Sequence, residues 1–317
     1  MGENVHTIKQ AKAELERVIL GKPQEIELLF TALLAKGHVL LESVPGSGKT
    51  KLAKSFAKVT GGTFKRVQFT PDVLPSDVTG IQFFNPKTQE FELRVGPVMT
   101  NVLLADEINR ATPKTQSSLL EVMEEYQTTI DGETLPVELP FLVIATQNPV
   151  ESNQGTFPLP EAQLDRFLFK VDMGYPVYDE EKNILATYRV DEPMDQLTSK
   201  LTHDTIMKLQ EQVKHVTLAE PVVDYLLTLV RATRDHLDID LGVSTRGALA
   251  FMRACQASAL IKGRTYVTPQ DVKFIAPYVM EHRIVLSMDG SIRKTVEEVV
   301  REILEKTEVP VEVGEGR

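Results

Sequence analysis

Eight consecutive residues have the types and order of a loop that binds phosphate. The full pattern is glycine, four residues of any kind and then Gly-Lys-Ser/Thr. This chain has serine in place of the first glycine. The residues are Ser43, Val44, Pro45, Gly46, Ser47, Gly48, Lys49 and Thr50. In such a loop, backbone N–H groups and the N-terminus of the next helix cradle the phosphates of a nucleotide. Lys49 would then reach the β- and γ-phosphates, and the Thr50 hydroxyl would bind Mg²⁺.

A second interpretation of the loop stays open at this point. The remaining Gly-Lys-Thr is a weak signal alone, because it also occurs by chance in chains of this length. The alternative is a glycine-rich turn between a strand and a helix, with Lys49 in solvent.

The dipeptide Asp106-Glu107 is a second candidate for phosphate chemistry, because it directly follows the apolar run 102–105. Carboxylates at the carboxyl end of a buried parallel strand face the crevice where α/β sheets bind ligands. We expect Asp106 to hold Mg²⁺ through water, and Glu107 to polarise a water for attack on the γ-phosphate. Alternatively, the pair only caps a helix that Thr112 and Pro113 begin.

Several elements must position these residues. Apolar runs at 38–42, 101–105 and 141–145 predict buried strands, and a shorter run at 167–171 predicts another. Helical periodicity lies between the runs. Nearly continuous apolar strands that alternate with helices are typical of a parallel sheet covered on both faces, so we expect an α/β fold.

Two hairpins are expected within this part of the chain. Asp131-Gly132 stands between two short β-prone runs and is typical of a hairpin turn. A second hairpin would turn near Asn85-Pro86. The two hairpin regions cover about 76–98 and 127–138. Between them, the acidic stretch 121–125 is expected to be the solvated face of a helix.

The chain changes character after Pro176, where strand-like runs stop and helical periodicity dominates. At 317 residues the chain is also long for a single core. We predict a boundary near residues 175–195. The expected parts are a core at 1–175, a smaller helical domain at 176–306 and a frayed tail at 307–317.

Composition excludes several classes of protein. Hydrophobic residues make up 42% and charged residues 25%, which excludes a chain disordered throughout. The single cysteine, Cys255, excludes an internal disulfide and a cysteine-rich metal site. The formal net charge of −10 argues against a bulk nucleic-acid binder. No apolar run approaches the roughly 18 residues that span a bilayer, and no signal peptide is evident. The expected location is the cytoplasm.

Three longer blocks carry a resemblance to a known family. They read DEINRATPKTQ at 106–116, ATQNP at 145–149 and GTFPLPEAQLDRF at 155–167. These blocks resemble the signatures of the MoxR family of AAA+ ATPases, and the similarity runs from about residue 8 to about residue 305. The resemblance implies a P-loop core that hydrolyses ATP with Mg²⁺, plus a smaller all-α lid. It also implies a ring of identical chains, usually a hexamer.

The resemblance also assigns roles to further residues. Asn148 matches the polar residue that helps to place the attacking water. Arg166 matches the arginine finger that reaches the γ-phosphate of a neighbouring subunit. Arg246 matches the lid arginine that senses the nucleotide. The family's adenine contacts would fall on Val18, Ile19 and Gly21. The expected catalytic set is Lys49, Glu107, Asn148, Arg166 and Arg246.

Each of these side chains also has a simpler interpretation. Asn148 with Pro149 could merely start a turn. Arg166 and Arg246 could be surface ion-pair partners, because most arginines are solvated. Arg110 could face a neighbouring active site, pair within the ring or line a pore, and the sequence does not choose among these.

The family implies chaperone-like work on client proteins, namely remodelling, maturation or loading of a metal or cofactor. It also implies a partner with a von Willebrand factor A domain. Two other functions compete with this one. The first is a motor stimulated by nucleic acid, which the net charge of −10 disfavours. The second is a regulatory scaffold that binds nucleotide without hydrolysing it.

Overall fold

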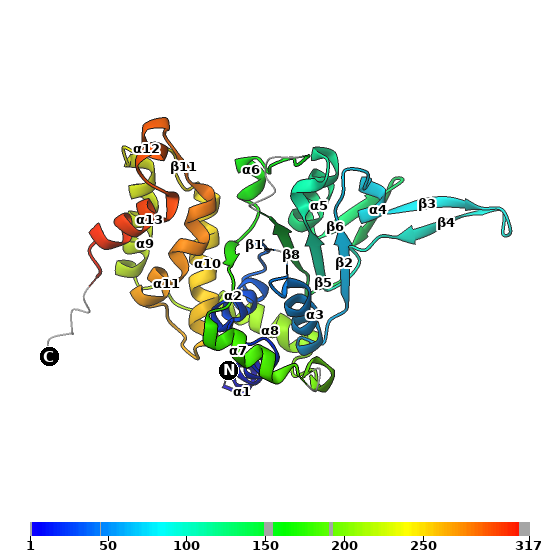
Figure 1. Ribbon diagram of the computed structural model, residues 1–317, viewed down its shortest axis with the longest axis horizontal. Coiled ribbons are helices and arrows are strands. Elements are labelled where there is room, and N and C mark those ends of the chain that lie inside the picture. The colour runs from blue at the N-terminus through cyan, green and yellow to red at the C-terminus, as the bar shows by residue number, and fades with distance from the viewer. Residues whose placement is uncertain (1, 45, 149–154, 190–192, 311–317) are drawn as a thin grey trace.

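The structure is a computed structural model that describes residues 2–44, 46–148, 155–189 and 193–310. Its centre is a five-stranded parallel sheet with the order β2-β5-β8-β1-β9 (Figure 1). The strands are β1 (Val39–Ser43), β2 (Phe64–Gln68), β5 (Val102–Asp106), β8 (Leu142–Gln147) and β9 (Phe169–Met173). The predicted α/β fold with a parallel sheet is therefore confirmed.

One strand of this sheet was not predicted from the sequence. Strand β2 lies at the edge of the sheet, and its residues are half-buried or exposed. Its sequence, FKRVQ, lacks the apolar runs from which the other four strands were predicted. A strand with one neighbour and a solvent-exposed face needs less apolar surface. The search for apolar runs, which finds buried strands, therefore misses it.

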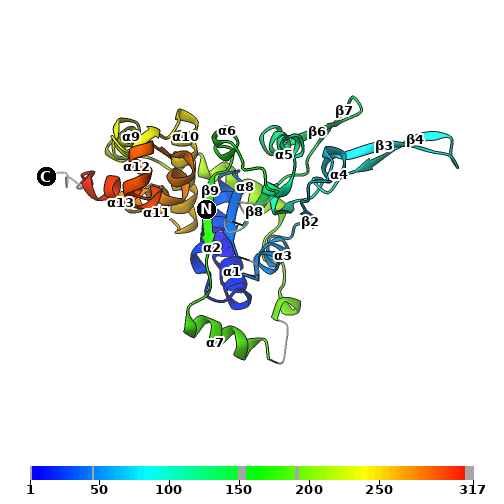
Figure 2. The same cartoon turned by 45° about the horizontal axis from the view of Figure 1, so that its top comes forward.

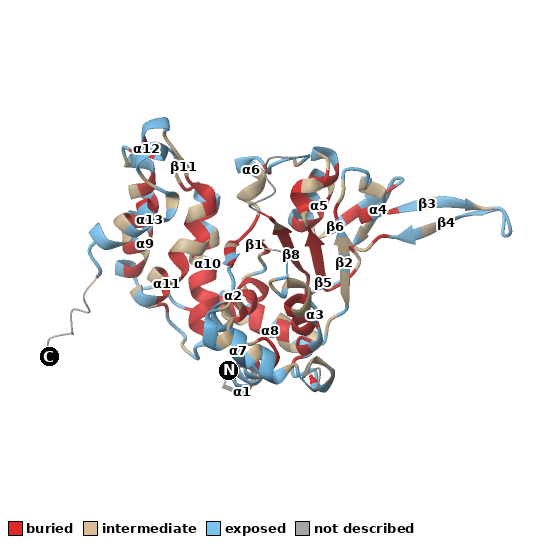
Figure 3. Cartoon of the chain, viewed as in Figure 1, coloured by how far each residue is buried: buried red, intermediate tan, exposed pale blue. Residues whose placement is uncertain are grey.

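Helices cover both faces of the sheet. Val39 and Leu41 of β1 pack in one hydrophobic cluster with α1, α2 and α3, whereas Leu40 packs in a second cluster with α5. This split follows from the alternation of side chains along a strand. Figure 3 shows buried positions on the sheet and on the inner sides of the helices. The helices of this part are α1 (Gly2–Val18), α2 (Pro23–Leu34), α3 (Lys49–Val59), α4 (Pro75–Thr79), α5 (Pro113–Glu125), α6 (Glu161–Leu164) and the 3-10 turn η1 (Ile108–Arg110).

Both expected hairpins are present. Strands β3 (Gly80–Asn85) and β4 (Glu90–Val95) pair as one antiparallel ribbon that extends away from the sheet (Figures 1 and 2). Strands β6 (Gln127–Ile130) and β7 (Glu133–Pro136) form the other. Its turn residues Asp131 and Gly132 have φ of 47° and 90°, the positive values that a tight hairpin turn requires.

The C-terminal half is mainly helical. Helices α9 to α13 form a second body beside the sheet, and α10 packs against α2 (Figure 1). Helix α8 also contacts α2, where Gln210 donates a hydrogen bond to the Leu33 carbonyl over 2.7 Å. The helices are α7 (Tyr178–Thr187), η3 (Pro193–Gln196), α8 (His203–Val213), α9 (Glu220–Asp235), α10 (Thr245–Ile261), α11 (Pro269–Met280), η4 (Glu281–Arg283), α12 (Met288–Arg293) and α13 (Val296–Lys306).

Two features of this half bear on the sequence predictions. Strands β10 (Ile239–Leu241) and β11 (Val285–Leu286) form a small antiparallel sheet, so the expectation that strands end after Pro176 was wrong. Strands of two or three residues are too short to show an alternating pattern. The division into 1–175 and 176–306 stays a prediction, and residues 311–317 of the expected tail lie outside the described residues. Over the described ranges, no helix has the length and apolar character to cross a membrane.

Candidate active site

The loop between β1 and α3 leaves room for an anion at the carboxyl edge of the sheet. Gly46 and Gly48 have φ of 80° and 84°, and no described atom beyond their chain neighbours lies within 4 Å of where a Cβ would stand on either. Helix α3 begins at Lys49, and no side chain in the described part of the chain caps it. The N–H groups of its first turn have no intrahelical acceptor, so they can serve as donors to a ligand. Pro45 lies outside the described residues.

The loop carries three hydroxyl residues, of which only Thr50 is required by the phosphate pattern. Ser43, which replaces the first glycine, is buried at the end of β1. The Oγ atoms of Ser43 and Ser47 are buried and have no hydrogen-bond partner among the described residues. Thr50 is half-buried in the first turn of α3. Unpaired buried hydroxyls are costly, and a bound phosphate or hydrated cation would satisfy them.

Asp106 ends β5 directly beside this loop. Its Oδ1 atom lies 3.0 Å from Lys49 Nζ and accepts a hydrogen bond from Thr146 Oγ1 over 2.6 Å. Its Oδ2 atom accepts from Arg66 Nη2 over 2.6 Å. Burial raises the pKa of Asp106, but the hydrogen bonds from Thr146, Arg66 and Lys49 outweigh burial and leave the pKa below its usual value. A buried carboxylate held ionised beside a lysine suits a site for Mg²⁺.

Glu107 follows in a conformation that is rare for its residue type. Its φ of 57° places it in the left-handed region, a strained conformation that occurs at functional sites. Its N–H donates to Thr146 Oγ1 over 2.9 Å, and its Oε2 accepts from Arg110 Nε over 2.9 Å. The backbone thus turns the Glu107 side chain away from the path of the strand. Arg110, whose role the sequence left open, pairs with Glu107 of its own chain.

Asn148 lies at the same edge, one residue beyond β8. The register pairs Ala105 of β5 with Ala145 of β8, so the residues after both strands emerge side by side. The Asn148 side chain is 5% exposed. The carboxyl edge therefore brings together the predicted residues Lys49, Thr50, Asp106, Glu107 and Asn148.

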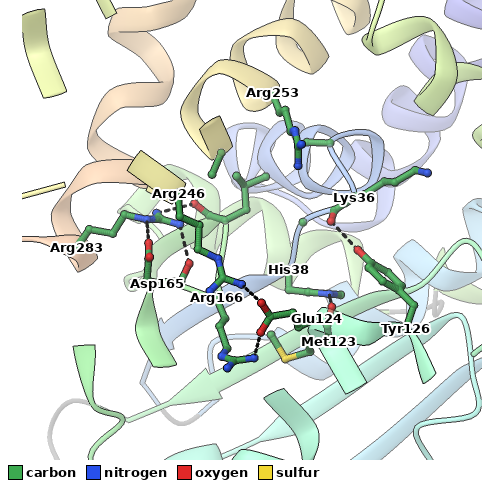
Figure 4. A pocket seen from close by; sticks show the side chains of 14 residues that line it. Lys36, His38, Met123, Glu124, Tyr126, Asp165, Arg166, Arg246, Arg253 and Arg283 are labelled. Carbon is green, nitrogen blue, oxygen red and sulfur yellow. Dashed lines mark hydrogen bonds and ion pairs between the residues drawn. The ribbon is translucent and has the colours of Figure 1, made fainter. Parts of the chain in front are cut away.

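The two predicted arginines lie elsewhere. Arg166 precedes β9, so it stands at the amino edge of the sheet, and Arg246 lies in the first turn of α10. Both pair with Glu124 of α5, Arg246 over 2.5 Å (Figure 4). They line a cavity of about 300 Å³ together with Lys36 and Arg253. The five residues of β1 alone separate the two edges by roughly 16 Å.

The residues predicted to contact adenine form a third group. Val18 and Ile19 are buried at the end of α1, and Gly21 has φ of 72°. The Val18 carbonyl accepts a hydrogen bond from Tyr188 over 2.6 Å, and Lys51 of α3 lies 3.6 Å from the centre of the Tyr188 ring. This segment therefore lies beside the helix that follows the phosphate loop.

Several residues of both edges were missed by the sequence predictions. Thr146 and Arg66 hold Asp106. Thr146 stands within the block 145–149 but was given no role, and Arg66 lies outside all three blocks. The acidic stretch 121–125 lies on a helix, as predicted, with its glutamates exposed and Val122 and Met123 buried. Glu124 of that stretch is, however, the partner of both arginines. The sequence does not reveal this role of Glu124, because Arg166 and Arg246 lie 42 and 122 positions further along the chain.

Comparison with known proteins agrees with this geometry. Residues 38–169 match the model of the ATPase family associated with various cellular activities (AAA), and residues 231–303 match the AAA lid domain. A crystal structure from Cytophaga hutchinsonii, described there as a candidate ATPase, superposes with a TM-score of 0.90. It is 36% identical and the match covers 98% of this chain and 96% of that one. The fold is thus that of an AAA+ core with its lid.

Curated relatives narrow the class. The chain is 48% identical to the YeaC protein of Bacillus subtilis, over 98% of this chain and 97% of that protein. It is 44% identical to the chaperone MoxR1 of Mycobacterium tuberculosis, over 95% of this chain and 81% of that protein. The chain belongs to the MoxR family of AAA+ ATPases.

Proposed function

We propose that this chain hydrolyses ATP to ADP and phosphate at sites shared between neighbouring copies. One observation carries the proposal: the groups suited to bind and attack ATP lie at one edge of the sheet, and the paired arginines lie at the other. Neither edge holds a complete set for phosphoryl transfer, which needs charge stabilisation as well as a positioned water. Two copies placed edge to edge would supply both.

At the carboxyl edge, the loop residues Ser43 to Thr50 would hold the triphosphate through backbone N–H groups. Lys49 would exchange its contact with Asp106 for the β- and γ-phosphates. Thr50 and Asp106 would hold Mg²⁺, which neutralises phosphate charge. The fit of this group rests on the buried ionised carboxylate and on the unpaired hydroxyls of the loop.

The same edge would activate the attacking water. Glu107 would accept a proton from this water, and the Asn148 amide, which both donates and accepts, would orient it. The strained backbone of Glu107 supports this role, because it aims a carboxylate away from the sheet. Val18, Ile19 and Gly21 would border the adenine.

At the amino edge, Arg166 and Arg246 would reach the γ-phosphate bound by the next copy. Their shared partner Glu124 supports this role, since it keeps two cations together at an open cavity. An edge that meets the opposite edge of the next copy makes a head-to-tail contact, which repeats until a ring closes. The family suggests six copies. Loss of the γ-phosphate would then change the contact between copies and reshape the ring.

We further propose that the ring does chaperone-like work on a protein client. The family suggests remodelling, maturation or loading of a metal or cofactor, together with a partner that carries a von Willebrand factor A domain. The relative named chaperone MoxR1 supports this direction. The client is unidentified, so a Glu107→Gln chain held on ATP is the suitable bait.

Mixing two inactive variants tests the shared site directly. Glu107→Gln removes the proton acceptor of one edge, and Arg166→Ala removes a cation of the other. In mixed rings, about a quarter of the contacts join an intact carboxyl edge to an intact Arg166, so turnover should return to about that fraction of wild type. Failure of the mixture to exceed its components, in rings shown to contain both, would contradict a shared site.

A further inference from the structure

A third arginine lies buried between the core and the lid. Arg283 ends η4, and its side chain is 2% exposed. Its Nε donates to Asp165 Oδ1 over 2.6 Å, and its Nη2 donates to the Phe167 carbonyl over 2.6 Å. Weaker bonds reach the carbonyls of Asp165 and Leu168 over 3.2 and 3.3 Å. One guanidinium therefore holds the backbone on both sides of Arg166 (Figure 4).

The same side chain also supports the start of α10. A Cβ on Gly247 would lie 2.9 Å from Arg283 Cδ, so glycine allows the helix to approach this closely. The Gly247 N–H donates to Ser244 Oγ over 3.0 Å, and Ser244 Oγ donates to Asp165 Oδ2 over 3.1 Å. Arg246 lies within this short segment. Its position is thus linked to Asp165 from the lid side.

We propose that Arg283 is a positioning residue that fixes Arg166 and Arg246 relative to each other for use on a neighbouring copy. This inference rests on the proposed function of the two arginines. Arg166 belongs to the core and Arg246 to the lid. The hydrogen bonds that Asp165 accepts from Arg283 and Ser244 connect the two backbone segments. Misplacement of a catalytic group by about 1 Å costs on the order of a hundredfold in rate, so these hydrogen bonds govern turnover.

Arginine suits this position because its planar fork carries five donors. Lysine could keep the ion pair with Asp165 but could not also reach the Phe167 and Leu168 carbonyls. Arg283→Lys should therefore preserve charge and loosen geometry. The matched control is Arg264→Lys, because Arg264 makes a two-pronged ion pair with Asp271 over 2.6 and 2.7 Å within the lid. That pair contacts neither Arg166 nor Arg246.

The test measures turnover and ATP binding of assembled wild type, Arg283→Lys and Arg264→Lys. Arg283→Lys should lower turnover about tenfold to a hundredfold while its affinity for a fluorescent ATP analogue stays within about twofold. Arg264→Lys should retain turnover per folded chain. Asp165→Asn is the second variant, for use if Arg283→Lys does not fold, and the same loss is expected.

Mixing separates positioning from general support of the fold. Glu107→Gln chains carry intact arginines, so they should restore turnover to the intact carboxyl edge of Arg283→Lys chains. Hydrogen exchange should quicken at 165–168 and 244–247 and stay unchanged at 46–50. Unchanged turnover, lost ATP binding or no rescue by Glu107→Gln would each overturn the inference. If Arg166→Ala itself leaves turnover intact, the proposed function has failed instead.

Discussion

The two edges of the central sheet bind charge in opposite ways. At the carboxyl edge, a buried carboxylate, Asp106, lies among cations, and its side chain is 2% exposed. At the amino edge, two partly exposed cations share one carboxylate, with Arg166 31% and Arg246 48% exposed. Strand ends fix the first group, whereas the second lies on a connecting loop and the first turn of a lid helix.

This difference indicates which edge would be complete before the proposed assembly. The groups around Asp106 are ordered by parallel strands and by direct hydrogen bonds, so their arrangement is fixed within one chain. The arginines are held by a surface carboxylate, and such ion pairs contribute at most about 1 kcal/mol. A more highly charged anion can therefore replace Glu124. The comparison predicts that turnover needs the reacting groups of both edges, and that substitution of the amino-edge arginines leaves nucleotide binding to the same chain intact.

The largest effect is expected for Arg166→Ala. Turnover by the assembled ring should fall roughly a thousandfold, because a cation at the γ-phosphate stabilises charge in the transition state. ATP affinity should stay close to wild type, since Arg166 lies at the far edge of its own chain. Steady-state phosphate release and ATP-analogue titration measure the two quantities. The control is Arg231→Ala, an exposed arginine of α9. A matching loss of ATP affinity would show that Arg166 serves its own nucleotide.

The next largest effect is expected for Glu107→Gln. Turnover should fall roughly a hundredfold or more, because glutamine cannot accept the proton of the attacking water. ATP should still bind, since Lys49, Thr50 and the loop amides are unchanged. Single-turnover hydrolysis with bound ATP is the measurement, and Glu121→Gln, at an exposed position of α5, is the control. Hydrolysis that persists in the variant would remove Glu107 from the proposed mechanism.

The two edges also differ in how far the sequence predicts them. The carboxyl edge could be predicted from local patterns, namely the phosphate loop and the acidic pair after an apolar strand. In a parallel sheet the carboxyl ends of the strands share one edge, so these two motifs come together. Arg66 was missed because β2 has no continuous apolar run. The amino edge depends on contacts between residues far apart in the chain, such as Arg246 with Glu124 and Arg283 with Asp165. No local pattern records such contacts, so only the family resemblance indicated Arg166 and Arg246.

Asp271 of the lid serves neither edge and so provides a reference for both. Burial raises its pKa, but hydrogen bonds from Arg264, Thr268 and Lys262 outweigh burial and lower the pKa to about 2. The folded pKa lies below the ordinary 3.8, so the stabilisation is present above pH 3.8 and is lost as pH falls toward 2. Asp271→Asn should cost about 2 kcal/mol of unfolding free energy at pH 7.

Denaturant unfolding at several pH values measures this cost. The difference in unfolding free energy between wild type and Asp271→Asn should narrow as the pH falls from about 4 to about 2. Both chains then carry a neutral group at position 271. Turnover per folded chain should be retained at pH 7, in contrast to the variants of either edge. A gap that does not change with pH would mean that Asp271 acts through packing, and lost turnover would connect the lid interior to catalysis.

The smallest effect is expected for Glu124→Gln, which tests whether Glu124 only holds the arginines until an anion arrives. The substitution keeps the shape of the side chain and removes the charge that the neighbour's phosphate would displace. Since two half-exposed ion pairs contribute at most about 1 kcal/mol each, the ATP concentration for half-maximal turnover should fall by only a few-fold. Maximal turnover should not change. The control is Glu125→Gln, at the next exposed position of α5. A tenfold loss of maximal turnover would instead make Glu124 part of the positioned set, and the amino edge would then be as preorganised as the carboxyl edge.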